Sequence, residues 1–197
     1  KPSSAASDVY KRQGDIYTVP VNGGKAAQIT TNAAYDTHPV WSPDGKQIAF
    51  ASDRMGSMDI FVVDREGGIP KRLTTHSGNE TPVAFKDADH ILFLANVMPS
   101  AEDAQFPSGQ FQQVYEVSTT GDRPVMFSSM PMEDISINKT GNALLYHDKK
   151  GYEDPWRKHH TSSITRDIWL CSLDGKRSYR KLTSFNGEDL SLIHISE

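Results

Sequence analysis

The sequence predicts an all-β fold, an open partial β-propeller with about three complete four-stranded blades plus half of another. Two observations predict it: a strand–turn–strand pattern that recurs along the chain, and the lack of sustained apolar residues at helical spacing. A β-sandwich also has short strands separated by regular turns, and it is the main competing fold. The recurrence of the whole pattern favours the propeller.

The pattern is clearest in residues 38–53. Two apolar runs flank the turn sequence of residues 42–45. There Pro43 presets φ, Asp44 can bond its own backbone and Gly45 can take a left-handed conformation. Residues 59–64 then predict a third strand and residues 71–74 a fourth. A four-stranded meander of roughly forty residues is the size of one propeller blade.

Copies of the third strand mark the repeat. They begin at Asp15, Asp59, Gln113 and Asp167. We therefore expect complete blades near 37–75, 81–128 and 133–185, preceded by the outer two strands of another blade.

Insertions between the second and third strands lengthen the later copies, at residues 98–110 and 151–166. Insertions at the same point of each repeat fall on one face of the array, often the binding face. The second insertion supplies the candidates for peptide or partner contact: Trp156, Arg157, His159 and His160. Packing between the two insertions, or against the rest of a longer protein, is the preferred interpretation, with peptide binding second. Neighbouring histidines on an extended segment point in opposite directions, so they rarely chelate one ion.

Other polar and aromatic residues are interpreted as structural. Ser52, Asp53 and Arg54 combine a hydroxyl with an acid but lack a partnered histidine, so hydrogen bonding to the loop backbone is expected. Trp41 and Trp169 lie in repeat strands and are expected to pack between blades.

Composition excludes several classes of function. The chain has 197 residues and a net charge of −4, which gives no general attraction to nucleic acid or anionic lipid. No apolar run approaches the ~20 residues of a membrane-spanning helix. Cys171 is the only cysteine, so no internal disulfide forms. The seven histidines show no metal-binding spacing, and we expect no metal and no cofactor.

The two ends do not follow the repeat. Residues 1–13 and 190–197 resemble translated sequencing-adapter sequence and are interpreted as non-native flanks, which leaves residues 14–189 as the propeller fragment. Ordinary frayed termini are the alternative.

Two stretches carry a family resemblance. Residues 39–46, with 48–50, 52–54 and 59–61, look like the WD40-like (PD40) propeller repeat of TolB and of tricorn-type proteases. Residues 152–160, with 165–169 and 181–183, resemble the N-terminal propeller of bacterial tricorn-like, S41-type serine peptidases more than TolB.

The resemblance implies a non-catalytic propeller that gates substrate or scaffolds a serine peptidase. The catalytic residues of such peptidases lie in a separate region with no counterpart here, so no catalytic residue is carried over and this fragment is not expected to be an enzyme. The partners implied are a peptide or protein and the remaining blades and catalytic domains of the parent chain. A TolB-like interaction propeller with no enzyme attached is the alternative, and a propeller enzyme with its own site is the least favoured class. The family implies a periplasmic location, with the cytoplasm as the alternative.

Overall fold

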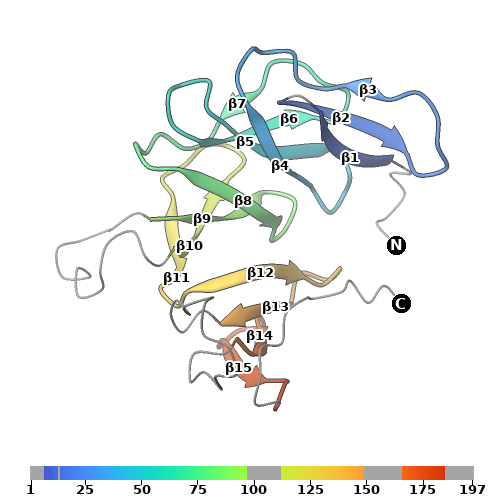
Figure 1. The fold of residues 1–197 in the computed structure, drawn as a ribbon. Helices are drawn as coiled ribbons and strands as arrows, with labels where there is room; N and C mark the ends of the chain where they lie inside the picture. The colour runs from blue at the N-terminus through green and yellow to red at the C-terminus, as the bar shows by residue number, and fades with distance from the viewer. Residues whose placement is uncertain (1–6, 13, 97–111, 149–165, 185–197) are drawn as a thin grey trace, which may run out of the picture. The chain divides into compact units, whose positions relative to one another are not determined.

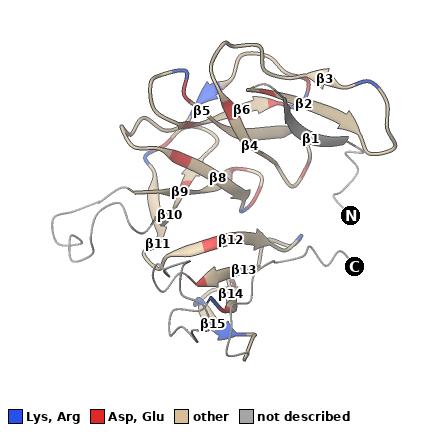
Figure 2. Ribbon diagram, viewed as in Figure 1, with Lys and Arg blue, Asp and Glu red and all other residues tan. Residues whose placement is uncertain are grey.

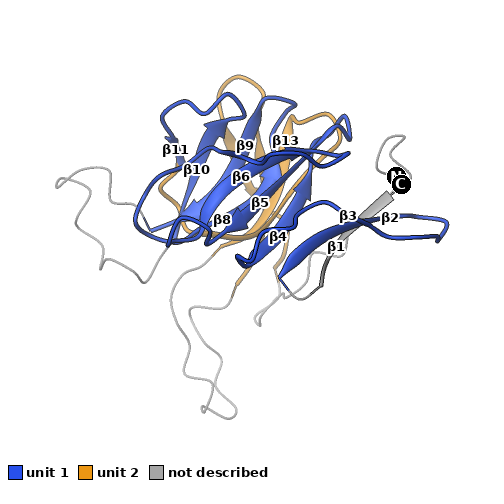
Figure 3. Cartoon of the chain, turned by 90° about the horizontal axis from the view of Figure 1, so that it is seen from above, with its two compact units in different colours: residues 1–127 blue, residues 128–197 orange. Residues whose placement is uncertain are grey.

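The computed structural model describes residues 7–12, 14–96, 112–148 and 166–184, with the backbone alone for residues 7–12. These residues form strands and turns and contain no helix. The chain divides into two compact units, residues 1–127 and residues 128–197 (Figure 3). Each unit is described by itself.

The first unit begins with a three-stranded antiparallel sheet, β1–β2–β3 (Figure 1). Its strands are β1 (Ser7–Arg12), β2 (Asp15–Pro20) and β3 (Ala27–Gln28). The predicted outer two strands are present, but β1 adds a third where no element was expected. Its register runs from Ser7↔Pro20 to Arg12↔Asp15 around a turn in which Gly14 has φ 90°. The main-chain hydrogen bonds that pair β1 with β2 need no particular side chains. Residues 7–12 therefore form a strand although they lack the sequence pattern of the repeat, which is why the sequence did not predict it. The non-native origin of residues 1–13 stays a prediction.

A four-stranded antiparallel meander follows in the order β4–β5–β6–β7. Its strands are β4 (Asp36–Trp41), β5 (Gln47–Ser52), β6 (Asp59–Asp64) and β7 (Lys71–Arg72). The predicted turn is present: Gly45 has φ 67° and its N–H donates to the Ser42 carbonyl at 2.9 Å. Ser42 Oγ also donates to Asp44 Oδ1 at 2.7 Å. This hydrogen bond, with the Lys46 N–H, lowers the pKa of Asp44 and holds the turn closed.

The third sheet repeats the meander in the order β8–β9–β10–β11. Its strands are β8 (Glu80–Phe85), β9 (His90–Ala95), β10 (Gln113–Ser118) and β11 (Val125–Ser128). The second unit contains one more meander, β12–β13–β14–β15. Its strands are β12 (Met132–Ile137), β13 (Ala143–Asp148), β14 (Ile168–Ser172) and β15 (Ser178–Lys181). These strands lie within the predicted blades 37–75, 81–128 and 133–185 with shifts of one residue at their starts, so the prediction of three complete four-stranded blades is confirmed.

Each complete sheet has a one-residue irregularity at the same place in its first strand. The register shifts between Thr37 and Val40 in β4, between Pro82 and Ala84 in β8, and between Glu133 and Ser136 in β12. Two of the shifts contain a residue with positive φ that is not glycine: His38 at 51° and Asp134 at 50°. A repeated bulge of this kind bends and twists the strand at a fixed point.

Apolar side chains pack between successive sheets of the first unit. One cluster joins Ile16 and Ile29 of the first sheet region to Ile48, Phe50 and Phe61 of the second, with Trp41 against it. A second cluster joins residues of the second and third sheets: Ala49, Ile60, Val62, Leu73, Phe85, Ile91, Phe93, Tyr115 and Val117. The core therefore lies between sheets, as face-to-face packing of blades requires, and the predicted packing role of Trp41 is confirmed.

Candidate functional site

The polar side chains of the first unit gather at the two ends of the sheets. We call the end where the second strand leads into the third the 2–3 end, and the opposite end, where the first leads into the second, the 1–2 end. The 2–3 end of the second sheet holds two buried groups of charged side chains, around Arg54 and around Glu80.

The Arg54 side chain contacts a carboxylate, a hydroxyl group and two aromatic rings. Its Nη2 donates to both oxygens of the fully buried Asp36, at 2.8 and 3.0 Å, and its Nε donates to Ser52 Oγ at 2.9 Å. The guanidinium also lies over the rings of Phe61 and Phe50, 4.6 and 5.3 Å from their centroids. Such a planar cation suits both the paired carboxylate and an aromatic face. The group is a structural anchor that ties the start of β4 to the loop after β5.

Two residues at the end of β5, Ser52 and Asp53, accept hydrogen bonds from backbone N–H groups. Asp53 Oδ1 accepts the Tyr35 N–H at 2.8 Å, and Ser52 Oγ accepts the Arg54 N–H at 3.4 Å. The expected hydrogen bonding to the loop backbone is therefore confirmed for Ser52 and Asp53, whereas it is wrong for the Arg54 side chain, which pairs with Asp36 instead.

The second buried group joins the second sheet to the third. Thr74 Oγ1 accepts the Ile60 N–H at 2.9 Å and donates a hydrogen bond to Glu80 Oε2. Asp59 lies nearby with its Oδ2 2.8 Å from Arg72 Nη2. This contact is an ion pair, and neither Asp59 oxygen has a further hydrogen-bond partner among the described residues. Two carboxyl groups thus share a buried space with one arginine.

Burial dominates the protonation of both acids. It raises the pKa of Glu80 to about 7, and the nearby Asp59 charge pushes it in the same direction. Burial also raises the pKa of Asp59, against the opposing attraction of Arg72. Proton uptake by this pair costs less than holding two charges out of water.

The same hydrogen bond recurs at the 2–3 end of other sheets. The Oγ1 atoms of Thr30 and Thr183 accept the N–H groups of Ile16 and Ile168, at 3.0 and 3.1 Å, as Thr74 does for Ile60. A second recurring contact joins the aspartate at the start of the third-strand repeat to the fourth strand. The pairs are Asp15 with Gln28, Asp59 with Arg72 and Asp167 with Lys181. Repetition in sheet after sheet indicates a structural unit of the fold.

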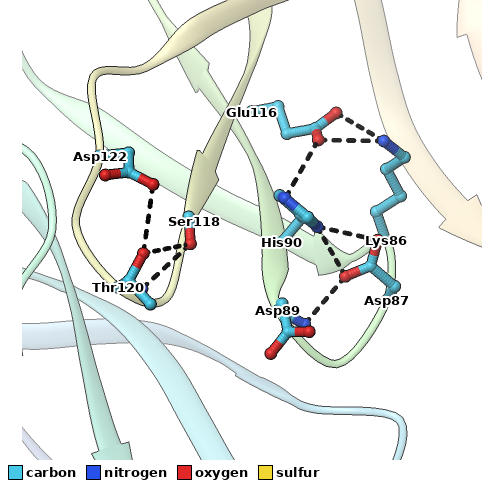
Figure 4. A network of polar contacts seen from close by, with 8 residues as sticks. All are labelled: Lys86, Asp87, Asp89, His90, Glu116, Ser118, Thr120 and Asp122. Carbon is cyan, nitrogen blue, oxygen red and sulfur yellow. Dashed lines mark hydrogen bonds and ion pairs between the residues drawn. The ribbon is translucent and has the colours of Figure 1, made fainter.

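A more exposed network lies at the 1–2 end of the third sheet (Figure 4). Lys86 Nζ pairs with the Glu116 carboxylate at 2.8 and 3.0 Å, and His90 Nδ1 lies 2.8 Å from Asp87 Oδ1. His90 Nε2 is 4.0 Å from Glu116 Oε1. Ser118, Thr120 and Asp122 form a separate set in the next turn. Surface pairs of this kind contribute little to stability and mainly fix the turn.

One histidine is oriented by an acid in the second unit. His147 is fully buried and its Nδ1 lies 3.0 Å from Oδ2 of Asp134, one of the two non-glycine residues with positive φ among the described residues. Its Nε2 has no partner among the described residues. An acid–histidine pair resembles part of a catalytic triad, but a buried Nε2 is beyond the reach of a substrate, so the pair has no catalytic geometry.

These arrangements support structure rather than chemistry. In the described ranges no three His, Cys, Asp or Glu residues lie close enough to hold a metal ion. Cys171 is buried, and burial raises the pKa of its thiol, which makes it a poor nucleophile. No helix that could cross a bilayer occurs in the part of the chain that the structure describes.

The residues proposed for peptide contact, Trp156, Arg157, His159 and His160, lie outside the described residues, and their role stays a prediction. The sequence interpretation missed the Glu80 group and the Asp134–His147 pair. The threonine that follows three of the fourth strands (Thr30, Thr74 and Thr183) was a usable signal, because its recurrence marks a side chain with a fixed partner.

Comparison with known proteins places these features in a family. The family model described as the tricorn protease N-terminal beta propeller domain matches residues 4–196. A tricorn protease homolog of Saccharolobus solfataricus is 24% identical over 189 residues, which cover 90% of this chain and 16% of the relative. Tricorn protease homolog 1 of Streptomyces coelicolor is 34% identical over 80 residues, covering 41% of this chain and 8% of the relative. The chain therefore spans less than a fifth of the length of these two relatives.

Solved structures share the fold. A putative TolB from Agrobacterium tumefaciens superposes with a TM-score of 0.60 at 20% identity, covering 92% of this chain and 64% of that structure. The tricorn protease superposes with a TM-score of 0.54 at 15% identity, covering 85% of this chain and 16% of that structure. With its repeated four-stranded sheets and a family match over nearly its whole length, the chain belongs to the tricorn protease N-terminal beta propeller family.

Proposed function

We propose that this chain is a non-catalytic propeller segment of a tricorn-like serine peptidase, in which it gates substrate or scaffolds the peptidase. The observation that carries the proposal is the use made of the buried polar groups. Hydrogen bonds at the strand ends join Arg54 to Ser52 and Thr74 to both Glu80 and the Ile60 backbone. These side chains are of the types found in catalytic sites, but here they stabilise the fold.

The family supports the same assignment. Its relatives are several times longer than this chain, which leaves room for a catalytic region elsewhere in the parent. A rigid array of sheets with variable connections is suited to presenting loops to a passing peptide, since loops tolerate change while the ladder satisfies the backbone. The proposed partners are therefore a peptide or protein and the remaining domains of the parent chain.

The test begins with the reading frame that contains residues 14–189. A PDZ-like domain and a serine peptidase core downstream are expected. A stop after the last blade would contradict the proposal and favour a TolB-like interaction propeller.

Gating and scaffolding can be distinguished by experiments on the intact parent protein. Gating predicts that deletion of the whole propeller increases hydrolysis of unfolded proteins relative to short peptides. Scaffolding predicts that both activities are lost along with the assembly, measured by sedimentation. Unchanged activity on both substrates would exclude both roles.

The insertion residues can be tested in the same parent. If Trp156 and Arg157 contact peptide, changing both to Ala should weaken peptide affinity without lowering the unfolding temperature. The matched control is Arg65→Ala, which removes an exposed arginine from a turn. Unchanged affinity with lower stability would show that the insertion is structural.

We also propose a periplasmic location for the parent, on the family resemblance. Fractionation of cells that express the full-length protein tests it, and recovery in the cytoplasmic fraction would contradict it.

A further inference from the structure

Two neighbouring contacts between sheets of the first unit each contain a buried acid at the same place in the repeat. We call the contact between the first and second sheets the first seam, and that between the second and third sheets the second seam. The Asp36 N–H donates to the Gly14 carbonyl at 2.7 Å. The Glu80 N–H donates to the Met58 carbonyl at 2.8 Å. Each carbonyl belongs to the residue just before a third-strand repeat, so Asp36 and Glu80 are equivalent.

The two acids are both buried but differ in the group that satisfies them. Asp36 accepts two hydrogen bonds from Arg54, at 2.8 and 3.0 Å, and Arg54 comes from the connection after β5. The corresponding connection after β9, residues 96–112, contains no Lys, Arg or His in its sequence. Glu80 accepts its hydrogen bond from the neutral hydroxyl group of Thr74 instead. The acid of the first seam therefore has its own arginine, and the acid of the second seam has a threonine.

The charged groups around Glu80 do not replace this arginine. Asp59 of β6 adds a second negative charge, and Arg72 of β7 pairs with Asp59, with 2.8 Å between Nη2 and Oδ2. His76, in the loop between β7 and β8, also acts on Asp59. In β9 the residue paired with Glu80 is the uncharged Ala95. Figure 2 shows the acidic charge on β8 and the basic charge on β7. Two acids thus face one arginine, and a proton on Glu80 balances the charges.

The opposite end of the second seam is held in a different way. Lys71 of β7 donates from Nζ to the carbonyl oxygens of Thr119 and Thr120 in the third sheet, at 3.1 and 2.6 Å. Apolar side chains of both sheets pack in the middle of the seam. The contact at the 1–2 end contains no acid, so proton loss from a carboxyl group leaves it in place. The 2–3 end contains both buried acids.

We propose that Glu80 is a proton-dependent switch that closes the 2–3 end of the second seam when protonated and lets this end open when ionised. In the ionised state two buried carboxylates repel each other, and local opening returns the Glu80 charge to water. The first seam stays closed because Arg54 balances Asp36. The change is expected as the pH rises towards neutrality, since burial raises the pKa of Glu80 to about 7. The switch thus couples the mobility of two adjacent sheets to pH.

Amide hydrogen exchange of the 197-residue chain, followed by NMR, tests the proposal. Protection factors are compared because they remove the intrinsic pH dependence of exchange. The reporters are the equivalent N–H groups of Glu80 and Asp36, which lie at the starts of their strands, where exchange proceeds through local opening. Protection of the Glu80 amide should fall about fiftyfold between about pH 5 and about pH 7.5, from a pKa of 4.5 in the open state and about 7 in the closed state. Protection of the Asp36 amide should change by less than about threefold.

Two variants show whether the Glu80 carboxyl group is responsible. Glu80→Gln leaves Asp59 and His76 in place but cannot ionise at position 80, so protection there should be independent of pH. Asp59→Asn should lessen the fall in protection, because the neighbouring charge that raises the pKa of Glu80 is absent. Asp15→Asn is its matched control, since Asp15 holds the equivalent place in the first sheet, and it should leave the Glu80 profile unchanged.

Several results would overturn the proposal. Protection at Glu80 that stays constant with pH would show that the seam does not respond to a proton. Equal falls at Glu80 and Asp36 would show that the proton acts on the whole fold rather than on one seam. A fall that persists in Glu80→Gln, or equal effects of Asp59→Asn and Asp15→Asn, would assign the pH dependence to another group.

Discussion

Arg54 shows how one side chain fixes a strand end in this fold. Its side chain is about nine-tenths buried, and its guanidinium pairs with the fully buried Asp36 and lies over two aromatic rings. Removing one partner of a buried pair leaves the other charge without compensation, which costs more than the pair itself contributes.

Replacement of Arg54 with Met should therefore lower the free energy of unfolding by about 3–5 kcal/mol. Chemical denaturation measures it. Arg65→Met, at a half-exposed arginine paired with Glu66, serves as control and should change stability by no more than about 0.5 kcal/mol. Equal effects of the two substitutions would contradict the anchoring role.

Glu80 is expected to make the stability of the fold depend on pH. Its pKa rises from the ordinary 4.5 to about 7 because it is buried beside Asp59. A raised pKa means that the folded state holds the proton more tightly than the unfolded state. The stabilising effect of that proton is complete below about pH 4.5, declines between 4.5 and 7, and is lost above 7.

Glu80→Gln keeps the shape of the side chain but cannot ionise. Its stability relative to wild type should rise by about 3 kcal/mol between pH 4.5 and pH 7.5, from the linkage between pKa and folding. Denaturation midpoints across this range measure the difference. Glu66→Gln, in an exposed turn, should leave the pH profile unchanged. A constant difference between Glu80→Gln and wild type would contradict the buried-acid interpretation.

At the scale of elements, a threonine two residues after β3, β7 and β15 joins the end of each of these strands to the strand before it. Its hydroxyl accepts a backbone N–H that the ladder leaves unpaired at the strand end. Because a buried donor left without an acceptor costs more than a hydrogen bond contributes, this short contact matters even where β3 and β7 are two residues long.

Thr30→Val should lower the free energy of unfolding by about 1–3 kcal/mol, because the Ile16 N–H loses its acceptor. Thr74→Val should cost more, since Glu80 loses its partner as well. The exposed neighbour Thr31→Val is the matched control and should have little effect on denaturation. If Thr30→Val and Thr31→Val behave alike, the recurring hydrogen bond is not a stabilising unit.

For the whole molecule, the proposed role as a propeller segment predicts that the chain alone has no peptidase activity. The purified 197-residue chain should hydrolyse no peptide, because its serine and histidine side chains in the described ranges are engaged in the fold or lack a nucleophile–base pair. Fluorogenic peptides across a range of pH test this. Turnover that disappears in Ser52→Ala would show that the chain has a catalytic site of its own.

Sequence reasoning went furthest where the signal is local. The turn at Pro43–Gly45 and the short apolar runs around Phe50 and Ile60 predicted the second sheet to within a residue or two. Turn chemistry and a short apolar run act over a few residues, so they can be read directly. The buried Glu80 group could not be found this way, since its members come from the ends of three strands.

What the sequence determined by itself was the identity of the elements, their repeat and the family. What only the tertiary structure decided was which groups meet: Asp36 with Arg54, Glu80 with Thr74, and β1 with β2. The same distinction explains Leu73 and Leu182, which have the same place in the repeat but differ in exposure. A side chain's periodicity is a property of its own strand, whereas its burial depends on whether another sheet covers it.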